Sequence, residues 1–395
     1  VIDQTPEDKN PVQKFFSNLI ERIILPFLGE GGGEVLLGPT HVLTPGTGWS
    51  GSTTVPGPIG NPSMLGYNAT VIAHWDEVPF RDISGIENVG VMAYHINGIE
   101  KVSFSVNNGG WVDVTTPILN PETNVEEYWA VLDSSLFSSN VLAEVRAIVY
   151  PLTAGKPKVL QGTSMMHNTS MLFNVNPSVP RVRYVSNSGV NSPTCGQILS
   201  NPCLNITDAI NSAAVSNNVD GVQLRLLNGR YILPHYPGTA TTTNRWFTIT
   251  SAENANPNNV IIDGFVDYSN SGALEPIRHF RVYNLTLTKA LKAPGASGVP
   301  NFVWIDKVKA YYESPTAVTG DPPCFDLAHW PDSYSTITRT YMTDVYINNS
   351  CWAAYGNILV RNVFADYTGW GWGGTHTVIN YTIRNTDSLN GAIED

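Results

Sequence analysis

Five stretches of the second half decide the fold: residues 260–266 (VIIDGFV), 303–312 (VWIDKVKAYY), 341–349 (YMTDVYINN), 359–367 (LVRNVFADY) and 378–385 (VINYTIRN). Each alternates apolar and polar side chains around one Asp or Asn, and VYNLTLT at 282–288 fits the same frame. The recurring residues, at intervals of 21, 22, 38, 18 and 18, are Asp263, Asn284, Asp306, Asp344, Asn362 and Asn380. One coil of a parallel β-helix takes roughly twenty residues, and Asn or Asp suits a turn in which the side chain bonds backbone groups. The repeat therefore predicts such stacked coils, and the interval of 38 is either one coil with an insertion or a skipped coil.

The start of this region carries a further signal. A strand at 181–189 (RVRYVSNSG) is followed by a polar loop, a short helix at 206–214 and a strand at 221–231 (GVQLRLLNGRY). This order resembles the entry of pectate-lyase-like β-helices, and the resemblance implies a right-handed parallel β-helix over 181–395. In such proteins the helix covers the open first coil. We see no comparable helix after Asp387, so we expect further chain or another molecule to cover the other end.

We predict that residues 63–162 form a β-sandwich. Short alternating segments without helices mark a small sandwich, and the candidate strands are 69–74, 89–95, 101–106, 111–115, 127–132 and 142–150. Asn107-Asn108-Gly109-Gly110 supplies the residues of a tight hairpin. The runs KVSFSVNNGGWVDV, EYWAVLD and AEVRAIVYP resemble immunoglobulin-like modules of secreted proteins. Residues 163–180 are expected to be a linker.

Residues 1–62 are interpreted as an N-terminal arm. Asn10 and Pro11 suit a helix start, and six large apolar residues then recur at helical spacing: Phe15, Phe16, Leu19, Ile20, Ile23 and Ile24. A Gly/Pro-rich strap without regular periodicity follows, up to Pro62. A helix this short is not stable alone, so its apolar face must dock, either on its own domain or on a neighbouring subunit. We expect residues 1–62 to pack mainly against other chains.

Composition restricts the partners. The net charge is -11, and an acidic surface repels phosphate backbones, so we expect no nucleic-acid partner. No stretch of eighteen apolar residues occurs, so the sequence predicts no membrane span. The chain begins at Val1 and not at Met, which we interpret as a processed or trimmed product.

The four cysteines allow three pairings, and none has the spacing of a zinc site. We favour two disulfides, Cys195–Cys203 and Cys324–Cys351, which implies an oxidising compartment; the alternative is four buried free thiols. Six sequons permit N-glycosylation without demonstrating it, at Asn68, Asn168, Asn205, Asn284, Asn348 and Asn380. An inward column of Asn284 and Asn380 would leave no room for glycans at those two positions.

Candidate catalytic residues form no tight motif. A β-helix lyase needs a basic proton abstractor and a cation that neutralises the substrate carboxylate, and an inverting hydrolase needs two carboxylates spaced for a water. The residues that fit these roles are Lys307, Lys309, Arg339, Asp326 and Asp344. Lys307 and Lys309 share a strand face by alternation, but such lysines more often serve solubility.

Other binding chemistry is sparse. His329 and His376 lack a second pair of ligands at suitable spacing, and no phosphate loop or nucleophile elbow occurs, so we expect no metal and no cofactor. The aromatic run at Tyr367, Trp370 and Trp372 is interpreted either as a platform for sugar rings or as a subunit contact.

The layout of arm, immunoglobulin-like module and β-helix resembles modular surface proteins of aquatic microbes and their viruses, including uncharacterised proteins of cyanophages. The resemblance carries no catalytic residue. We therefore expect a structural subunit of an extracellular filament, appendage or virion surface, which assembles through repeated contacts between identical chains. The alternatives are a polysaccharide-degrading lyase, hydrolase or depolymerase, and an adhesin that binds glycans without turnover.

Overall fold

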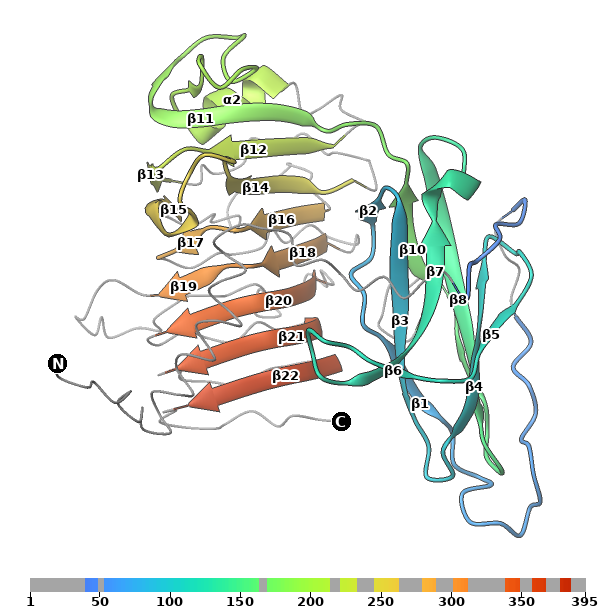
Figure 1. Ribbon diagram of the computed structural model, residues 1–395. Coiled ribbons are helices and arrows are strands. Elements are labelled where there is room, and N and C mark those ends of the chain that lie inside the picture. Colours follow the sequence, from blue (N-terminus) through green and yellow to red (C-terminus); the bar gives the residue numbers. More distant parts are fainter. Residues whose placement is uncertain are drawn as a thin grey trace, which may run out of the picture. The chain divides into compact units, whose positions relative to one another are not determined.

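The computed structural model describes residues 40–48, 53–162, 169–213, 221–232, 245–262, 279–288, 301–311, 338–348, 357–366 and 377–384. All of them belong to one compact unit, residues 39–395; the other unit is 1–38. The described residues form 22 strands, one α-helix and two 3-10 helices (Figure 1). The protein is therefore all-β, as predicted. It has two sheets of mainly antiparallel strands and one sheet of parallel strands.

The first sheet has the strand order β1-β3-β7-β6 and is entirely antiparallel. Its strands are β1 (Ile72–Trp75), β3 (Ile86–Tyr94), β6 (Ile118–Leu119) and β7 (Glu126–Asp133). The 3-10 helix η3 (Ser134–Leu136) follows β7.

The second sheet has the order β2-β10-β8-β4-β5, with β9 also paired to β8. Its strands are β2 (Arg81–Ile83), β4 (Ile99–Val106), β5 (Val112–Val114), β8 (Val141–Pro151), β9 (Lys158–Leu160) and β10 (Met171–Val175). Only the β2–β10 pair is parallel. Asn107 and Asn108 have φ of 49° and 60° between β4 and β5, which confirms the predicted hairpin.

The two sheets share one apolar core. Alternate residues of β4, Val102, Phe104 and Val106, are fully buried in it, together with Trp75 of β1 and Phe173 of β10. The period-two pattern predicted a half-buried strand, but the intervening Ser103 and Ser105 are buried as well, at 4 % and 1 % exposed. The apolar core is nevertheless built by residues that the sequence pattern places on one face of each strand.

Two stretches expected to lie outside the sandwich contribute to it. Leu43, in the strap, is fully buried in the core, and its N–H donates to the carbonyl of Val131 at 2.9 Å. Strand β10 lies inside the expected linker 163–180 and pairs with both β8 and β2. The prediction that residues 1–62 bury little against their own sandwich is therefore wrong for the described part of the strap. An extended Pro/Gly-rich chain can add to a sheet edge without any periodic signal.

The parallel sheet contains two successions of strands. The first is β11 (Arg181–Val190), β12 (Val222–Leu226), β14 (Phe247–Ser251), β16 (His279–Tyr283), β18 (Asn301–Asp306), β20 (Thr338–Asn348), β21 (Asn357–Asp366) and β22 (Thr377–Arg384). The second is β13 (Gly229–Tyr231), β15 (Val260–Ile262), β17 (Thr286–Leu287) and β19 (Lys309–Tyr311), which reaches the far half of β20. The 3-10 helix η5 (Pro257–Asn259) precedes β15.

Every pairing in this sheet is parallel, and β20 joins the two successions because its first half pairs with β18 and its second half with β19. The strands thus stack as in a nearly closed parallel β-helix (Figure 1). The interior is filled by residues such as Leu224, Ile249, Ile305, Met342 and Val363.

The first strand is covered by helix α2 (Ile206–Ala213), close to the predicted bounds. Its buried residues Ile206, Ala209, Ile210 and Ala213 lie in the same apolar cluster as Val185 of β11. Asn205 caps this helix, since its Oδ1 accepts the N–H of Asp208 at 2.9 Å. The predicted Cys195–Cys203 disulfide is confirmed, whereas Cys324 and Cys351 lie outside the described residues.

The recurring Asn and Asp residues occupy one corner of the coils. Asn284, Lys307, Asp344, Asn362 and Asn380 all have φ between 51° and 55°, the left-handed region that Asn and Asp tolerate best. Asn362 Nδ2 donates to Asp344 Oδ1 at 2.9 Å, and Asn380 Nδ2 donates to Asn362 Oδ1 at 2.8 Å. We call these five residues the corner column. Asp344, Asn362 and Asn380 bond one another from coil to coil, whereas Asn284 Nδ2 donates to Ser251 Oγ.

One assignment in this repeat is wrong by one residue. Asp306 pairs with Thr343, so its neighbour Lys307 takes the corner next to Asp344. The side chain of Asp306 instead accepts from Arg281 and from Thr343 Oγ1. Because β18 pairs directly with β20, the interval of 38 is one coil with an insertion. Asp263 lies outside the described residues.

Candidate functional site: a buried joint between the sandwich and the parallel stack

Segment 72–82 of the sandwich runs along the outer face of the stack. Its alternate residues contact successive strands, in the order Asp82 with Arg245, Phe80 with His279 and Phe302, Asp76 with Arg361, and His74 with Thr377. These partners lie just before β14, on β16, β18, β21 and at the start of β22. A period of two residues per step is the geometry of an extended chain with one side facing its partner. We call this contact the joint.

The half of the joint near β14, β16 and β18 is mainly aromatic, with the Asp82–Arg245 ion pair at its end. Phe80 packs edge-on against His279 and Phe302, with ring centroids 4.4 and 5.4 Å away, and Trp246 packs edge-on against Trp304 at 5.5 Å. Phe80, Trp246, Phe302 and Trp304 are all less than one tenth exposed. Edge-to-face aromatic pairs at such separations add to the stabilisation from burial.

Phe80 holds an unusual backbone conformation in this half, with a φ of 60°. A bulky residue rarely adopts a positive φ, and the surroundings must maintain it. Its N–H donates to the carbonyl of Leu172 at 2.6 Å, and its carbonyl accepts from Asn174 Nδ2 at 2.6 Å. Both partners belong to strand β10, which therefore fixes the direction of the Phe80 ring.

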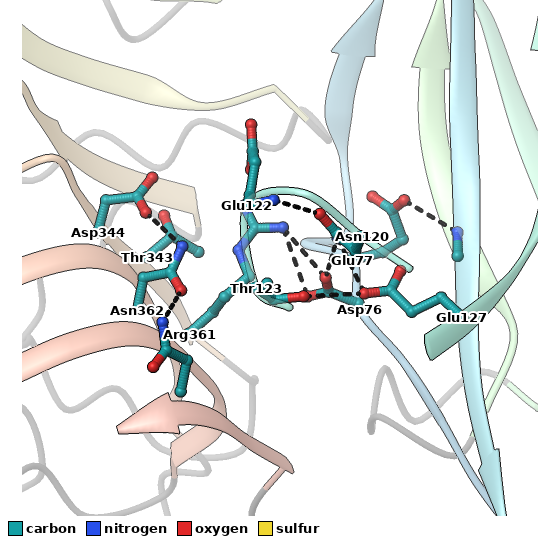
Figure 2. A network of polar contacts seen from close by, with 12 residues as sticks. Asp76, Glu77, Asn120, Glu122, Thr123, Glu127, Thr343, Asp344, Arg361 and Asn362 are labelled. Atoms are coloured by element: carbon teal, nitrogen blue, oxygen red, sulfur yellow. Dashed lines mark hydrogen bonds and ion pairs between the residues drawn. The ribbon is translucent and has the colours of Figure 1, made fainter. Parts of the chain in front are cut away.

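The other half of the joint is a polar network (Figure 2). Arg361 of β21 points from the stack to Asp76, and its Nη1 lies 3.4 and 3.3 Å from the two carboxylate oxygens. Asp76 is only 3 % exposed, and Asn120 Nδ2 donates to its Oδ2 at 3.5 Å. One guanidinium nitrogen is thus shared between both oxygens of a buried carboxylate in a bifurcated ionic contact.

Two further carboxyl groups lie behind Asp76 on the sandwich side. Glu127 Oε1 accepts from Asn120 Nδ2 at 2.9 Å, and its Oε2 accepts from Trp129 Nε1 at 2.9 Å. Glu77 accepts the N–H of Gly90 at 3.3 Å and forms an ion pair with Arg81 at 3.1 Å. Burial raises the pKa of Glu77 to about 7 despite the nearby arginines. Burial, reinforced by the charge of Asp76, raises the pKa of Glu127 to about 8.

Arg361 and Asp344 lie on the stack side of this network. Burial alone disfavours the charge on Arg361, but the carboxylates of Asp76, Asp344, Glu122 and Glu77 outweigh it and raise its pKa, so it stays protonated. Burial raises the pKa of Asp344, against the effects of Arg361 and Asn362. The joint therefore places the permanent positive charge of Arg361 near two buried carboxyl groups, Glu77 and Glu127, whose pKa values are raised to about 7 and 8.

This arrangement suits a structural contact that responds to protons. Glu127 is 1 % exposed and Glu77 9 %, so neither reaches a dissolved polymer. Within the described ranges no group of three or more His, Cys, Asp or Glu side chains is arranged to hold a metal ion. Coupled carboxyl groups at a contact between two modules make the stability of that contact depend on pH.

Three of the residues proposed for catalysis, Lys307, Lys309 and Asp344, have described side chains. Lys307 sits in the corner column just before β19, and Lys309 is the first residue of β19, with its Nζ 5.5 Å from the ring centroid of Tyr311. Asp344 accepts from Asn362 in the corner column. The backbone of Arg339 pairs with Phe302. Asp326, His329, His376, the aromatic residues Tyr367, Trp370 and Trp372, and the arm residues 15–24 lie outside the described residues.

The sequons fall into different environments. Asn68 and Asn205 are exposed. Asn284 and Asn380 use Nδ2, the atom that a glycan would modify, to donate to Ser251 Oγ and Asn362 Oδ1 at 3.1 and 2.8 Å. Asn168 lies outside the described residues, as does the side chain of Asn348.

Sequence reasoning missed the joint. Its signal is a set of isolated charges inside apolar strands, as in LVRNVF for Arg361 and EEYWAVL for Glu127, in a chain with only 14% charged residues. A buried charge needs a partner, but the partners Asp76 and Arg361 are separated by 285 residues in the sequence.

No family model, no curated protein and no solved structure matches this chain. Among the described residues, no helix has the length and apolar character needed to cross a membrane.

Proposed function

We propose that the protein is a structural subunit of an extracellular filament, appendage or virion surface, which assembles through repeated contacts between identical chains. The joint is the observation that carries this proposal. It fixes the sandwich to strands β16, β18, β21 and β22 of the stack through aromatic and ionic contacts, as expected of a subunit that transmits load between neighbours.

The positions of two proposed catalytic residues, Lys307 and Asp344, support the same function. Lys307 and Asp344 occupy consecutive positions of the corner column, where Asp344 accepts from Asn362 and Lys307 donates its N–H to Thr343. Residues used in this way maintain the turn of each coil. A polysaccharide lyase or hydrolase that depends on these two side chains is therefore the weaker proposal.

The finer assignments are proposals as well. The two sheets with a shared core support an immunoglobulin-like module, and the parallel coils with an entry helix support a right-handed β-helix. The Cys195–Cys203 disulfide supports an extracellular location. If the protein is glycosylated, the exposed Asn68 and Asn205 are the sites that the geometry favours.

Glycan binding is a second candidate function, favoured by one surface of the stack. Lys309, Tyr346 and Phe364 are consecutive cross-strand neighbours on β19, β20 and β21. The rings of Tyr346 and Phe364 stack at 5.6 Å with an interplanar angle of 3°. Phe364 is only 5 % exposed, so the half-buried Tyr346 and the exposed Lys309 are the two side chains of this surface that a sugar could contact.

The decisive test is the oligomeric state of the native protein. We expect sedimentation analysis and negative-stain micrographs to show regular assemblies at micromolar concentration. A persistent monomer would contradict the proposal. Binding to a glycan panel that is lost in the Tyr346→Ala variant, without any assembly, would favour the adhesin instead.

A further inference from the structure

An exposed apolar pair continues the joint beyond its last contact. Ile72 and Tyr94 are directly opposite each other on β1 and β3, and they are 56 % and 65 % exposed. Both lie at the end of the face that packs on the stack, since Ile72 precedes His74 by one step of two residues. The surface that covers the stack therefore extends past the strands it covers.

The register of the joint shows where this pair lies. Asp76 contacts β21 and His74 contacts β22, so one step of two residues along β1 corresponds to one strand of the stack. Two extended residues span about 6.6 Å, somewhat more than the spacing of about 4.8 Å between neighbouring strands. Ile72 consequently faces the position just beyond β22. In the part of the chain that the structure describes, β22 pairs only with β21.

The opposite end of the stack shows how such an end is closed. Helix α2 covers β11 with apolar residues at positions i, i+3, i+4 and i+7, namely Ile206, Ala209, Ile210 and Ala213. An Asn precedes the helix and caps it. The Cys195–Cys203 disulfide closes the loop between β11 and α2, and Cys203 forms isolated β-bridges with Val185 and Val190 of β11. The β11 end is thus occupied by its own chain.

Residues 11–25, which lie outside the described residues, repeat that pattern in sequence. Phe16, Leu19, Ile20 and Ile23 have the same spacing as the four buried residues of α2. The side chains are larger than those of α2 and would meet Ile72 and Tyr94, which reach beyond the stack. At about 1.5–3 kcal/mol for each fully buried large apolar side chain, such a contact can hold two molecules together.

We propose that segment 11–25 of a second copy covers the β22 end of the stack, with its apolar face against Ile72 and Tyr94. This inference rests on the proposed function, because assembly from identical chains requires that the segment leave its own molecule. The 14 residues from 26 to 39 extend to at most about 50 Å, which is enough to reach a neighbour. Among the described residues, α2 covers the β11 end of the stack, and no strand pairs with the outer side of β22.

Photo-crosslinking tests this assignment directly. The full chain carries a photoreactive phenylalanine analogue at position 72, and light and ¹⁵N-labelled preparations are mixed before assembly and irradiation. We expect cross-linked peptides that join position 72 of one isotope to residues 11–25 of the other. Cross-links only within one isotope, or only to residues 385–395 or another segment, overturn the inference.

Substitutions separate this contact from assembly as such. We expect the double variant Ile72→Asp with Tyr94→Asp to weaken association at least tenfold while its thermal unfolding profile stays unchanged. Ile86→Asp is the matched control, because Ile86 is also exposed on β3, 42 %, but at the opposite end of that strand. Normal assembly of the double variant overturns the inference and leaves the proposed function standing. Absence of assembly in the unmodified chain overturns both.

Discussion

The two halves of the joint solve the same packing problem with different chemistry. Around Phe80 and Trp246 the sandwich meets the stack through aromatic rings, whereas around Asp76 and Arg361 it meets the stack through charges. Aromatic burial stabilises a contact at any pH and tolerates small shifts of the rings. A buried ion pair costs desolvation energy and is favourable only in one geometry. The comparison indicates that the aromatic half supplies most of the stability and the polar half fixes the register.

The largest effect is expected in the aromatic half. Phe80→Ala removes a ring that is 4 % exposed and leaves a cavity among His279, Phe302 and Trp246, so we expect a loss of about 3–5 kcal/mol in unfolding free energy. Chemical denaturation at pH 5 and pH 8 measures the loss, which we expect to be the same at both. Val179→Ala, at a site 83 % exposed, is the control and should change little. An effect that differs between the two pH values would show that the two halves are coupled.

Breaking the ion pair is expected to cost somewhat less. Arg361→Met leaves Asp76 buried with an uncompensated charge, and we expect a loss of about 3 kcal/mol at neutral pH. The double variant Asp76→Asn with Arg361→Met removes both charges and should recover most of that loss. Denaturation of the single and double variants completes a double-mutant cycle. If the double variant is as unstable as Arg361→Met, the pair does not act as a unit.

The polar half should also make stability depend on pH. Glu77 and Glu127 have pKa values of about 7 and 8 in the folded chain, against 4.5 for the ordinary carboxyl group. Between these values the folded state holds protons that the unfolded state has lost, so stability is greatest below about 4.5 for these groups and falls as pH rises through 7 and 8. We expect Glu127→Gln to reduce that fall by about 2 kcal/mol. Thermal unfolding from pH 5 to pH 9 measures it, and an unchanged slope in the variant would rule out Glu127 as the source.

The smallest effect is expected in the corner column, away from the joint. Asn362→Ala removes the side-chain hydrogen bonds to Asp344 and Asn380, and Ala tolerates a φ of 51° less well than Asn does, so we expect a loss of about 1–2 kcal/mol. Asn362→Gly should cost less, because glycine adopts that φ freely. Equal losses in both variants would show that the hydrogen bonds matter and the backbone conformation does not.

The local elements could be predicted because their signals are local. The alternation in Val102–Val106, the hairpin residues Asn107 and Asn108, and the spacing of Asn362 and Asn380 each lie within one strand or one coil. The predicted corner position at Asp306 was wrong by one residue, because Lys307 takes the left-handed conformation there, against the usual preference for Asn or Asp. Residue type alone could not reveal that exception.

The joint could not be predicted because its contacts are not local. Nothing near Asp76 in the sequence indicates that an arginine 285 residues later is its partner. Leu43 was missed for a related reason: it stands alone in a Pro/Gly-rich strap, and only the sandwich core gives its apolar side chain a role. Composition predicts that such a segment is extended, but where it packs depends on the sheet to which it binds in the folded protein.

The separation of the partners in the joint also has a consequence for the timing of synthesis. The face of Asp76 and Phe80 belongs to the module made first, and its last described partner, Thr377, follows His74 by 303 residues. At about 5–20 residues per second, a ribosome needs about 15 to 60 s to produce the strands that cover this face. For that period a folded sandwich would present exposed aromatic rings and unpaired carboxylates to the surrounding solution. Newly made chains should therefore bind chaperones through this face, and they should release them as the final coils are added.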